Sequence, residues 1–203
     1  TSLREFGDRF DAEVREDLTL TIQEEAERLN RFVANLLNMT KLESGALTID
    51  GVAFGVAEVV GRVVQRAQRQ AGAREIISSI SPDDLAAYGD PILTEQALAN
   101  VVENAVRFVP NGGRIEISGR SVGGKVVLEI IDDGPGVPES DLQMIFDKFF
   151  RSAATSTNQQ GTGLGLSISR GLVEAMGGEV FARPRGDGCP GLVVSVILPG
   201  ASS

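Results

Sequence analysis

The chain has 203 residues, of which 42% are hydrophobic and 23% charged, and a formal net charge of −9. The composition is ordinary for a folded protein, and the length allows one or two domains. The negative charge argues against binding to nucleic acid, no apolar run approaches the ~18 residues of a membrane span, and the single cysteine, Cys189, excludes an internal disulfide. We therefore expect neither nucleic acid nor a membrane to contact this chain.

A long charged segment comes first. Residues 11–44 contain no proline and no glycine, which predicts one amphipathic helix of about nine turns, Asp11–Ser44. Gly45 stands where a helix C-cap would, and Thr1–Phe6 looks like the end of an earlier helix closed by a turn at Gly7-Asp8. A helix of this length with a narrow apolar stripe usually packs in a coiled coil or bundle. The stripe consists of Leu18, Ile22, Leu29, Phe32, Val33, Leu36, Leu37 and Met39.

After residue 45 the pattern becomes mixed α and β, with glycine-rich turns between the strands of each hairpin. We expect, in order, a strand Ala46–Phe54, a helix Glu58–Gln70, strands Ile76–Ile80 and Leu85–Tyr88, a helix Pro91–Phe108, strands Arg114–Arg120 and Val126–Asp132, helices Leu142–Phe149 and Leu164–Met176, and strands Glu179–Arg183 and Leu192–Leu198. The sequence thus predicts a helical segment, 1–45, followed by an α+β domain, 46–203.

The helix Pro91–Phe108 carries the first candidate site. Asn100, Glu103 and Asn104 lie three and four positions apart and therefore share one helix face. Two amides and a carboxylate offer oxygen ligands to a hard cation such as Mg²⁺, whose remaining ligands are phosphates and water. A solvated helix face explains the same residues, and by themselves they favour that alternative.

Two glycine-rich motifs follow. In the run 132–136 (DDGPG), Asp132 can accept a hydrogen bond from an exocyclic amine, while Gly134 and Gly136 let the backbone pass close to a flat ring. The run 161–166 (GTGLGL) precedes a helix, where exposed N–H groups and the helix dipole favour a phosphate. It has no Walker ending and follows no strand, which excludes the P-loop and dinucleotide-binding motifs. An ordinary turn and a flexible hinge are the alternatives.

The run 146–151 (FDKFFR) lies between these two motifs. Lys148 and Arg151 could reach phosphates, whereas we expect the phenylalanines to pack in the core. The alternative for the two cations is that they lie along apolar surface with their charges in water. The segment Ser152–Gln160 that follows is polar and shows no periodic pattern.

The motifs in this order resemble the ATPase domain shared by histidine kinases, Hsp90-type chaperones, gyrase B and MutL. The Phe-rich run and the polar segment point to the histidine kinase branch, and residues 11–44 resemble the second helix of the kinase dimerisation hairpin. Residues 21–45 (TIQEEAERLNRFVANLLNMTKLESG) are similar in particular to Kdp-type potassium sensor kinases. The resemblance implies an α+β fold, a two-layer α/β sandwich of the Bergerat type, preceded by a long dimerisation helix.

The resemblance also implies a role for each motif residue. Asn104 would hold Mg²⁺, Glu103 would act as general base towards the acceptor histidine, and Lys148 and Arg151 would neutralise transferred charge. Ser152–Gln160 would be the ATP lid. Asp133 departs from the commoner Asn of the family, and Phe108 from the usual Tyr. Contacts with ATP are implied for Asn100, Asn104, Arg107, Phe108, Asp132, Gly134, Gly136, Gly161, Thr162, Gly163, Leu164, Gly165 and Leu166.

The implied reaction passes the ATP γ-phosphoryl group to a histidine and then to an aspartate of a response regulator. In the family this happens in a homodimer, on the cytoplasmic side of a sensor anchored in the inner membrane. The chain contains no histidine, however. The family's acceptor lies upstream of a turn like Gly7-Asp8, so either the acceptor helix has been cut away or the parent protein lacks the acceptor. A start within a helix favours the first explanation. This chain would then bind ATP without phosphorylating itself.

Three other functions share the same core. A Hsp90- or gyrase-like ATPase would use Glu103 to activate water, but it needs coupling domains that do not follow here. An anti-sigma factor that phosphorylates serine usually has no dimerisation helix. A regulatory pseudokinase would bind partners without catalysis, and the intact Asn104, Asp132 and glycine motifs argue against it.

Overall fold

Helix α2 covers Ala12–Glu43, and residues at both of its ends explain where it stops. Asp11 precedes it and accepts a hydrogen bond from a backbone N–H of the first turn at 2.9 Å, as an N-cap does. Gly45 follows it with φ 66°, and the N–H of Ala46 donates to the carbonyl of Lys41 at 3.0 Å. This is the hydrogen bond of a Schellman C-cap, so the expected helix and its cap are confirmed.

The computed structural model describes residues 11–152, 162–186 and 188–201. It divides the chain into two compact units, 1–40 and 41–203. Apolar residues of α2 in the first unit are exposed, among them Leu29 and Leu37. In the described ranges no helix is both long enough and apolar enough to cross a membrane.

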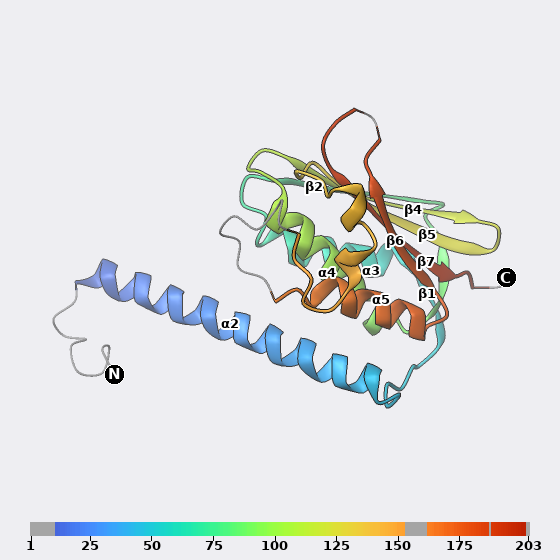
Figure 1. The fold of residues 1–203 in the computed structure, drawn as a ribbon, viewed down its shortest axis with the longest axis horizontal. Helices are drawn as coiled ribbons and strands as arrows, with labels where there is room; N and C mark the ends of the chain where they lie inside the picture. The colour runs from blue at the N-terminus through green and yellow to red at the C-terminus, as the bar shows by residue number, and fades with distance from the viewer. Residues whose placement is uncertain (1–10, 153–161, 187, 202–203) are drawn as a thin grey trace. The chain divides into compact units, whose positions relative to one another are not determined.

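The second unit is organised around a five-stranded sheet (Figure 1). β2 and β4 are parallel, and all other neighbours are antiparallel. A second, two-stranded sheet pairs β1, Val52–Gly55, with β3, Ala86–Gly89. The order across the large sheet is β2 (Glu75–Ser81), β4 (Arg114–Val122), β5 (Lys125–Asp132), β7 (Leu192–Pro199) and β6 (Glu179–Pro184).

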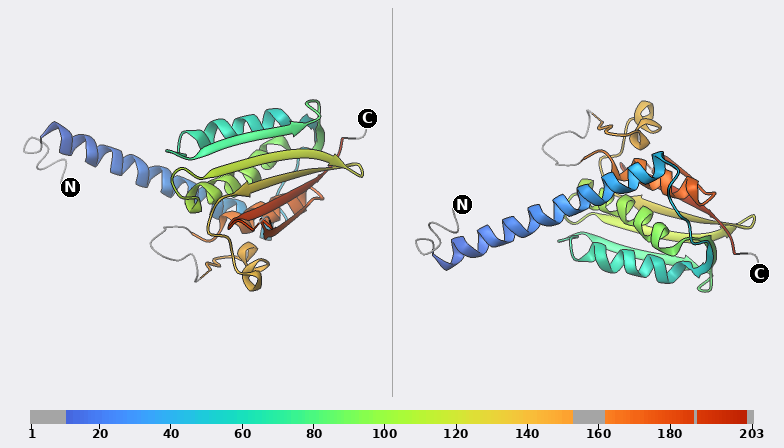
Figure 2. Two further views of the ribbon diagram at one scale, coloured as in Figure 1. Left: turned by 90° about the horizontal axis from the view of Figure 1, so that it is seen from above. Right: turned by 90° about the horizontal axis from the view of Figure 1, so that it is seen from below.

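Helices α3 (Val56–Gln68), α4 (Pro91–Phe108) and α5 (Gly165–Ala175) lie on one face of this sheet, as Figure 2 shows from two sides. Alternate residues of the central strands point into the layer between sheet and helices and are fully buried. The hydroxyl of Ser169 in α5 donates to the carbonyl of Ala97 in α4 at 2.9 Å. The expected two-layer α/β sandwich is therefore confirmed.

Helix α4 begins at a well-defined cap, which fixes the direction of the site residues that follow. Asp90 accepts hydrogen bonds from the N–H groups of Ile92 and Leu93 at 2.9 and 3.1 Å, and Pro91 occupies the first helical position. The helix buries one face through small and branched residues. The opposite end, near Phe108, opens towards the loop after β5.

Two expected elements are wrong. The strand expected over Ala46–Phe54 exists only as β1, because β3 offers partners to four residues alone. The range of the helix expected over Leu142–Phe149 contains a single 3₁₀ turn, η3 (Met144–Phe146), and another 3₁₀ turn, η2 (Glu139–Asp141), precedes it. Phe149 takes φ 63°, which no right-handed helix accommodates, and its N–H donates to the carbonyl of Gly163 instead.

Candidate functional site

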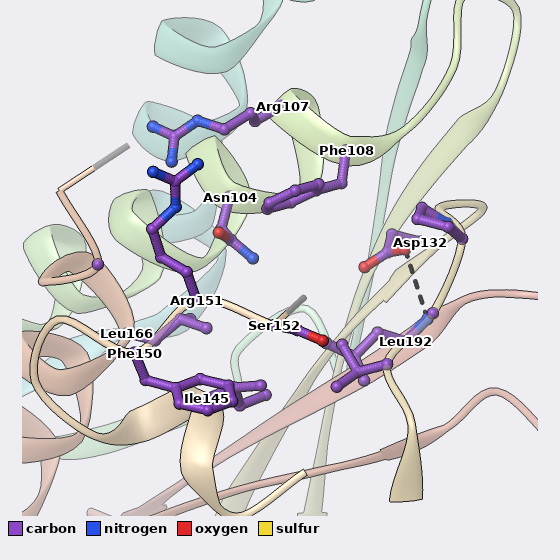
Figure 3. Close-up of a pocket in the computed structure, with 14 residues that line it drawn as sticks. Asn104, Arg107, Phe108, Asp132, Ile145, Phe150, Arg151, Ser152, Leu166 and Leu192 are labelled. Carbon is purple, nitrogen blue, oxygen red and sulfur yellow. Dashed lines mark hydrogen bonds between the residues drawn. The ribbon is translucent and has the colours of Figure 1, made fainter. Parts of the chain in front are cut away.

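A hollow of about 790 Å³, counting the part open to solvent, lies in the second unit between α4, the loop after β5, the segment after η3, and the starts of α5 and β7 (Figure 3). It is continuous, although the residues around it come from five separate stretches of the sequence. It is lined by Asn104, Arg107, Phe108, Asp132, Pro135, Gly136, Val137, Ile145, Phe150, Arg151, Ser152, Gly163, Leu166 and Leu192.

Asp132, the last residue of β5, places a buried carboxylate at one end of the hollow. Its side chain is 7% exposed, and Oδ1 accepts hydrogen bonds from the N–H groups of Gly134 at 2.8 Å and Leu192 at 3.4 Å. Oδ2 accepts none from the part of the chain that the structure describes, and a carboxylate oxygen is directed into the hollow (Figure 3). The site thus offers a bound molecule one strong acceptor.

Burial raises the pKa of Asp132, and the neighbouring charge of Asp133 raises it further. The two backbone N–H donors and the guanidinium of Arg185 act in the opposite direction. A buried carboxylate with one unused oxygen is costly, and a hydrogen-bond donor on a ligand would offset that cost.

The glycines after Asp132 are required by space. A Cβ on Gly134 would lie 2.7 Å from Oδ1 of Asp132. Gly136 has φ 74°, and a Cβ there would lie 3.2 Å from the carbonyl oxygen of Gly191. A side chain is therefore unfavourable at both positions, and the predicted approach of this backbone to a flat ring stays a prediction.

Apolar side chains form the walls next to Asp132. Phe108 comes from the end of α4, Ile145 and Phe150 from the segment before residue 153, and Leu192 from the start of β7 (Figure 3). Apolar walls with one buried acceptor suit a flat heterocycle that carries an amino group. Sequence reasoning named Phe108 but missed Ile145, Phe150 and Leu192, and it assigned all the phenylalanines of 146–151 to the core.

The opposite end of the hollow is positively charged. Arg107 of α4 and Arg151 both line it, and Figure 3 shows both guanidinium groups away from Asp132. No side chain caps the first turn of α5, which begins at Gly165. Two guanidinium groups and an uncapped helix N-terminus favour an anion, so this end suits phosphate groups.

The residues on either side of the predicted lid segment contact each other through a backbone hydrogen bond. The N–H of Phe149 donates to the carbonyl of Gly163 at 2.9 Å, and a Cβ on Gly163 would lie 2.8 Å from the backbone of Phe149. Ser152 is buried, and its hydroxyl donates to Asp141 at 2.6 Å. Residues 153–161, including the predicted ATP contact Gly161, lie outside the described residues.

The asparagines of α4 occupy different environments. Asn104 lines the hollow. The amide nitrogen of Asn100 is buried and has no hydrogen-bond partner among the described residues, although Asn100 lies against Gly165 at the start of α5. An orphaned donor beside the uncapped end of α5 is costly, and a phosphate oxygen or a water molecule there would satisfy it.

A cation in this site would depend on few protein ligands. The described residues contain no group of three or more His, Cys, Asp or Glu side chains that could hold a metal. Asn104 is the predicted ligand that lines the hollow. One amide oxygen together with phosphates and water is a coordination pattern that Mg²⁺ accepts.

Two predicted catalytic residues do not line the hollow. The carboxylate of Glu103 accepts a hydrogen bond from Arg66 of α3 at 2.9 Å. Lys148 forms an ion pair with Glu43, in the last turn of α2 that belongs to the second unit. Their catalytic roles stay predictions, and the third such residue, Arg151, does line the hollow.

The remaining predicted nucleotide contacts surround the start of α5. Gly163 and Leu166 line the hollow, and Leu164 is buried in the core. Thr162 is exposed, and its hydroxyl oxygen accepts a hydrogen bond from the N–H of Leu164 at 3.4 Å. Gly165 opens the helix.

Known proteins of one ATPase family resemble this chain. The family model described as "Histidine kinase-, DNA gyrase B-, and HSP90-like ATPase" matches residues 89–201, which include all of these motifs. The sensor protein KdpD of Clostridium acetobutylicum is 37% identical over 189 residues, 93% of this chain and 21% of that protein. KdpD of Mycobacterium tuberculosis H37Rv is 32% identical over 203 residues, 98% of this chain and 23% of that protein. The chain therefore spans about a fifth of the length of these relatives.

Solved structures of related proteins share the fold of this chain. A mycobacterial sensor histidine kinase, MprB, superimposes with a TM-score of 0.67 at 28% identity, over 75% of this chain and 100% of that one. Full-length ShkA, in complex with the nucleotide analogue AMPPNP, superimposes with a TM-score of 0.78 at 26% identity, over 96% of this chain and 40% of that one.

Proposed function

This chain belongs to the family of histidine kinase-, DNA gyrase B- and HSP90-like ATPases, and from that premise we propose that it is the ATP-binding catalytic region of a two-component sensor histidine kinase. The observation that carries the proposal is the polarity of the hollow. A buried acceptor, Asp132, lies at one end, and Arg107, Arg151 and the start of α5 lie at the other. ATP has an amino group on its base and its negative charge on the phosphates, and it matches both ends.

In this proposal the adenine amine donates to Oδ2 of Asp132, and the base lies between the walls formed by Phe108, Ile145 and Leu192. The triphosphate extends towards Arg107 and Arg151. Asn104 holds Mg²⁺, which neutralises phosphate charge when it is bound. That AMPPNP is bound in the related kinase ShkA supports the choice of nucleotide.

The proposed reaction breaks the bond between the γ-phosphorus and its bridging oxygen and forms a bond from phosphorus to an imidazole nitrogen. ADP leaves, and the imidazole proton passes to a base. Arg151 and the glycine-loop amides would stabilise the charge on the transferred group. Glu103 would serve as the base through its second oxygen, because Oε1 is paired with Arg66.

The acceptor has to come from outside this chain, because the 203 residues include no histidine. We propose that it lies on the partner helix of α2 in the same sensor, which acts as a homodimer. The phosphoryl group then passes to an aspartate of a response regulator. The proposed location is the cytoplasmic side of a sensor anchored in the inner membrane.

Calorimetry and a transfer assay test the two halves of the proposal separately. We expect this chain to bind Mg-ADP and to bind Mg-GDP much more weakly, because guanine has no amine at the position that Asp132 reads. Asn104→Ala should abolish the dependence of binding on Mg²⁺. Mg²⁺-dependent binding that is unchanged in this variant would remove Asn104 as the metal ligand.

For the transfer half, a separate helical hairpin carrying the acceptor histidine is incubated with this chain and labelled Mg-ATP. We expect acid-labile label on the hairpin and none on this chain. The matched control is a hairpin whose histidine is replaced by glutamine. Binding of ATP without any transfer would favour a regulatory role over catalysis.

A further inference from the structure

An ion pair between Asp133 and Arg185 lies next to Asp132, the carboxylate that is proposed to accept the adenine amine. Asp133 follows Asp132 at the end of β5, and Arg185 lies 52 positions further along, just after β6. The guanidinium of Arg185 donates to Oδ1 of Asp133 in a partly buried ion pair. Neither residue lines the hollow, so the pair does not belong to the surface that a nucleotide would contact.

Asp133 is fixed from two sides. Its Oδ2 accepts the N–H of Arg114 at 2.9 Å, and its own N–H donates to the carbonyl of Arg114 at 3.1 Å. Asp133 is therefore anchored to the beginning of β4, and its Oδ1 remains for Arg185. The contacts with Arg114 thus fix the Asp133 side chain independently of Arg185.

Arg185 is itself attached to the strand that contacts Asp132. Its N–H donates to the carbonyl of Gly191 at 3.3 Å, and its side-chain stem lies 3.3 Å from where a Cβ of Gly191 would be. The next residue, Leu192, donates its N–H to Oδ1 of Asp132. A closed ring of contacts thus runs from Asp132 through Leu192, Gly191 and Arg185 to Asp133, which is bonded to Asp132 in the chain.

The charges in this ring act on Asp132 in opposite directions. Asp133 raises the pKa of Asp132, and Arg185 lowers it. Without Arg185, the negative charge of Asp133 would be uncompensated one residue from the buried carboxylate. The other charged groups on the same hollow are Arg107 and Arg151, at its far end.

We infer that Arg185, paired with Asp133, is a positioning residue for nucleotide binding: it holds the start of β7 against Asp132 and keeps that carboxylate in the orientation that accepts a base amine. The inference rests on the proposed function. An aspartate at position 133, unlike an asparagine, provides Arg185 with a charged partner.

Four proteins test the inference: the unaltered chain, Arg185→Met, Asp133→Asn and the double variant. Met keeps most of the arginine stem, and Asn keeps the acceptor for the N–H of Arg114. ADP affinity is measured by calorimetry at a series of pH values, because burial raises the pKa of Asp132 and the variants should shift the pH dependence of binding. The ionisation of ADP itself is common to all four proteins.

For Arg185→Met we expect ADP affinity to fall by roughly threefold to tenfold near neutral pH, a range typical of coupled neighbours. The pH below which binding weakens should move upwards. In Asp133→Asn that pH should move downwards, and in the double variant it should return close to that of the unaltered chain. A role in folding alone would change the melting temperature without shifts of opposite sign.

The matched control is Arg120→Met, which removes an arginine of β4 that pairs with Glu129 and has no contact with Arg185 among the described interactions. We expect its ADP affinity and pH profile to be unchanged. Equal affinity and an equal pH profile in the Arg185→Met variant would overturn the inference, whatever its melting temperature. If the unaltered chain binds no ADP at any pH, the proposed function fails instead.

Discussion

Asp132→Asn separates what the buried carboxylate does for binding from what it costs in stability. Asn has nearly the same shape, and its Oδ1 can still accept the N–H groups of Gly134 and Leu192. The substitution removes a charge from a side chain that is 7% exposed. Because burial raises the pKa of Asp132, the folded state favours the protonated acid more than the unfolded state does.

The raised pKa of Asp132 determines how the stability of the folded domain changes with pH. A carboxyl group whose pKa is raised by folding stabilises the folded state at a pH below its unfolded-state pKa. This stabilisation is lost as the pH rises through its folded-state pKa. At neutral pH the ionised Asp132 therefore lowers the stability of the nucleotide-free domain. We expect Asp132→Asn to be more stable at neutral pH by on the order of 1 kcal/mol, a rise of about 2–4 °C in melting temperature for a domain of this size. The advantage should shrink as the pH falls.

Binding should change in the opposite direction. A hydrogen bond to a charged group contributes ~1.5–3 kcal/mol, so ADP affinity should fall by roughly tenfold to a hundredfold. Thermal unfolding with and without ADP, at neutral and acidic pH, measures both effects in one instrument. A variant that is less stable than the original at neutral pH without nucleotide, or that keeps full ADP affinity, would refute the reasoning.

Three further substitutions probe other parts of the structure. Gly163→Ala should lower the free energy of unfolding by about 2 kcal/mol and weaken nucleotide binding, as measured by denaturant unfolding and by calorimetry. The reason is that its φ is 69° and the new Cβ would lie 2.8 Å from the Phe149 backbone. Arg66→Met should leave ADP affinity unchanged and lower the free energy of unfolding by less than about 1 kcal/mol, since the arginine side of the Arg66–Glu103 pair is exposed to solvent. If Glu103 takes the proton, the pH profile of transfer to an acceptor hairpin should change in this variant. Gly45→Ala should destabilise the end of α2 by about 1–2 kcal/mol, because a φ of 66° is unfavourable for alanine even though nothing lies within 4 Å of the new Cβ. The loss should appear as reduced helical circular dichroism on mild heating.

Local patterns in the sequence predicted the elements and half of the site. The cap at Gly45, the helix Pro91–Phe108 and the acceptor at Asp132 follow from spacing and residue type, which act over a few positions. The helix expected over Leu142–Phe149 is wrong because Asp147 is extended, with ψ 149°, and the left-handed Phe149 after it donates its N–H to Gly163, which is distant in sequence.

The rest of the site depends on pairings that no local pattern shows. Leu192 contacts Asp132 only because β7 lies beside β5 in the sheet. Glu103 looks like a free base in the sequence, yet Arg66 of α3, 37 positions away, holds it. Such contacts follow from the order of strands and helices in space, which motif spacing does not determine.

Polar groups of the second unit that could bind a ligand lie in or near one hollow. One carboxylate oxygen of Asp132 faces it and no side chain caps the start of α5, while the buried amide nitrogen of Asn100, which does not itself line the hollow, has no hydrogen-bond partner among the described residues. Elsewhere, a buried polar side chain such as Ser169 is bonded within the core. A single ligand with an amine and phosphates would donate to the carboxylate at one end and accept from Arg107, Arg151 and the start of α5 at the other. This complementarity at both ends is the physical reason to expect a nucleotide there.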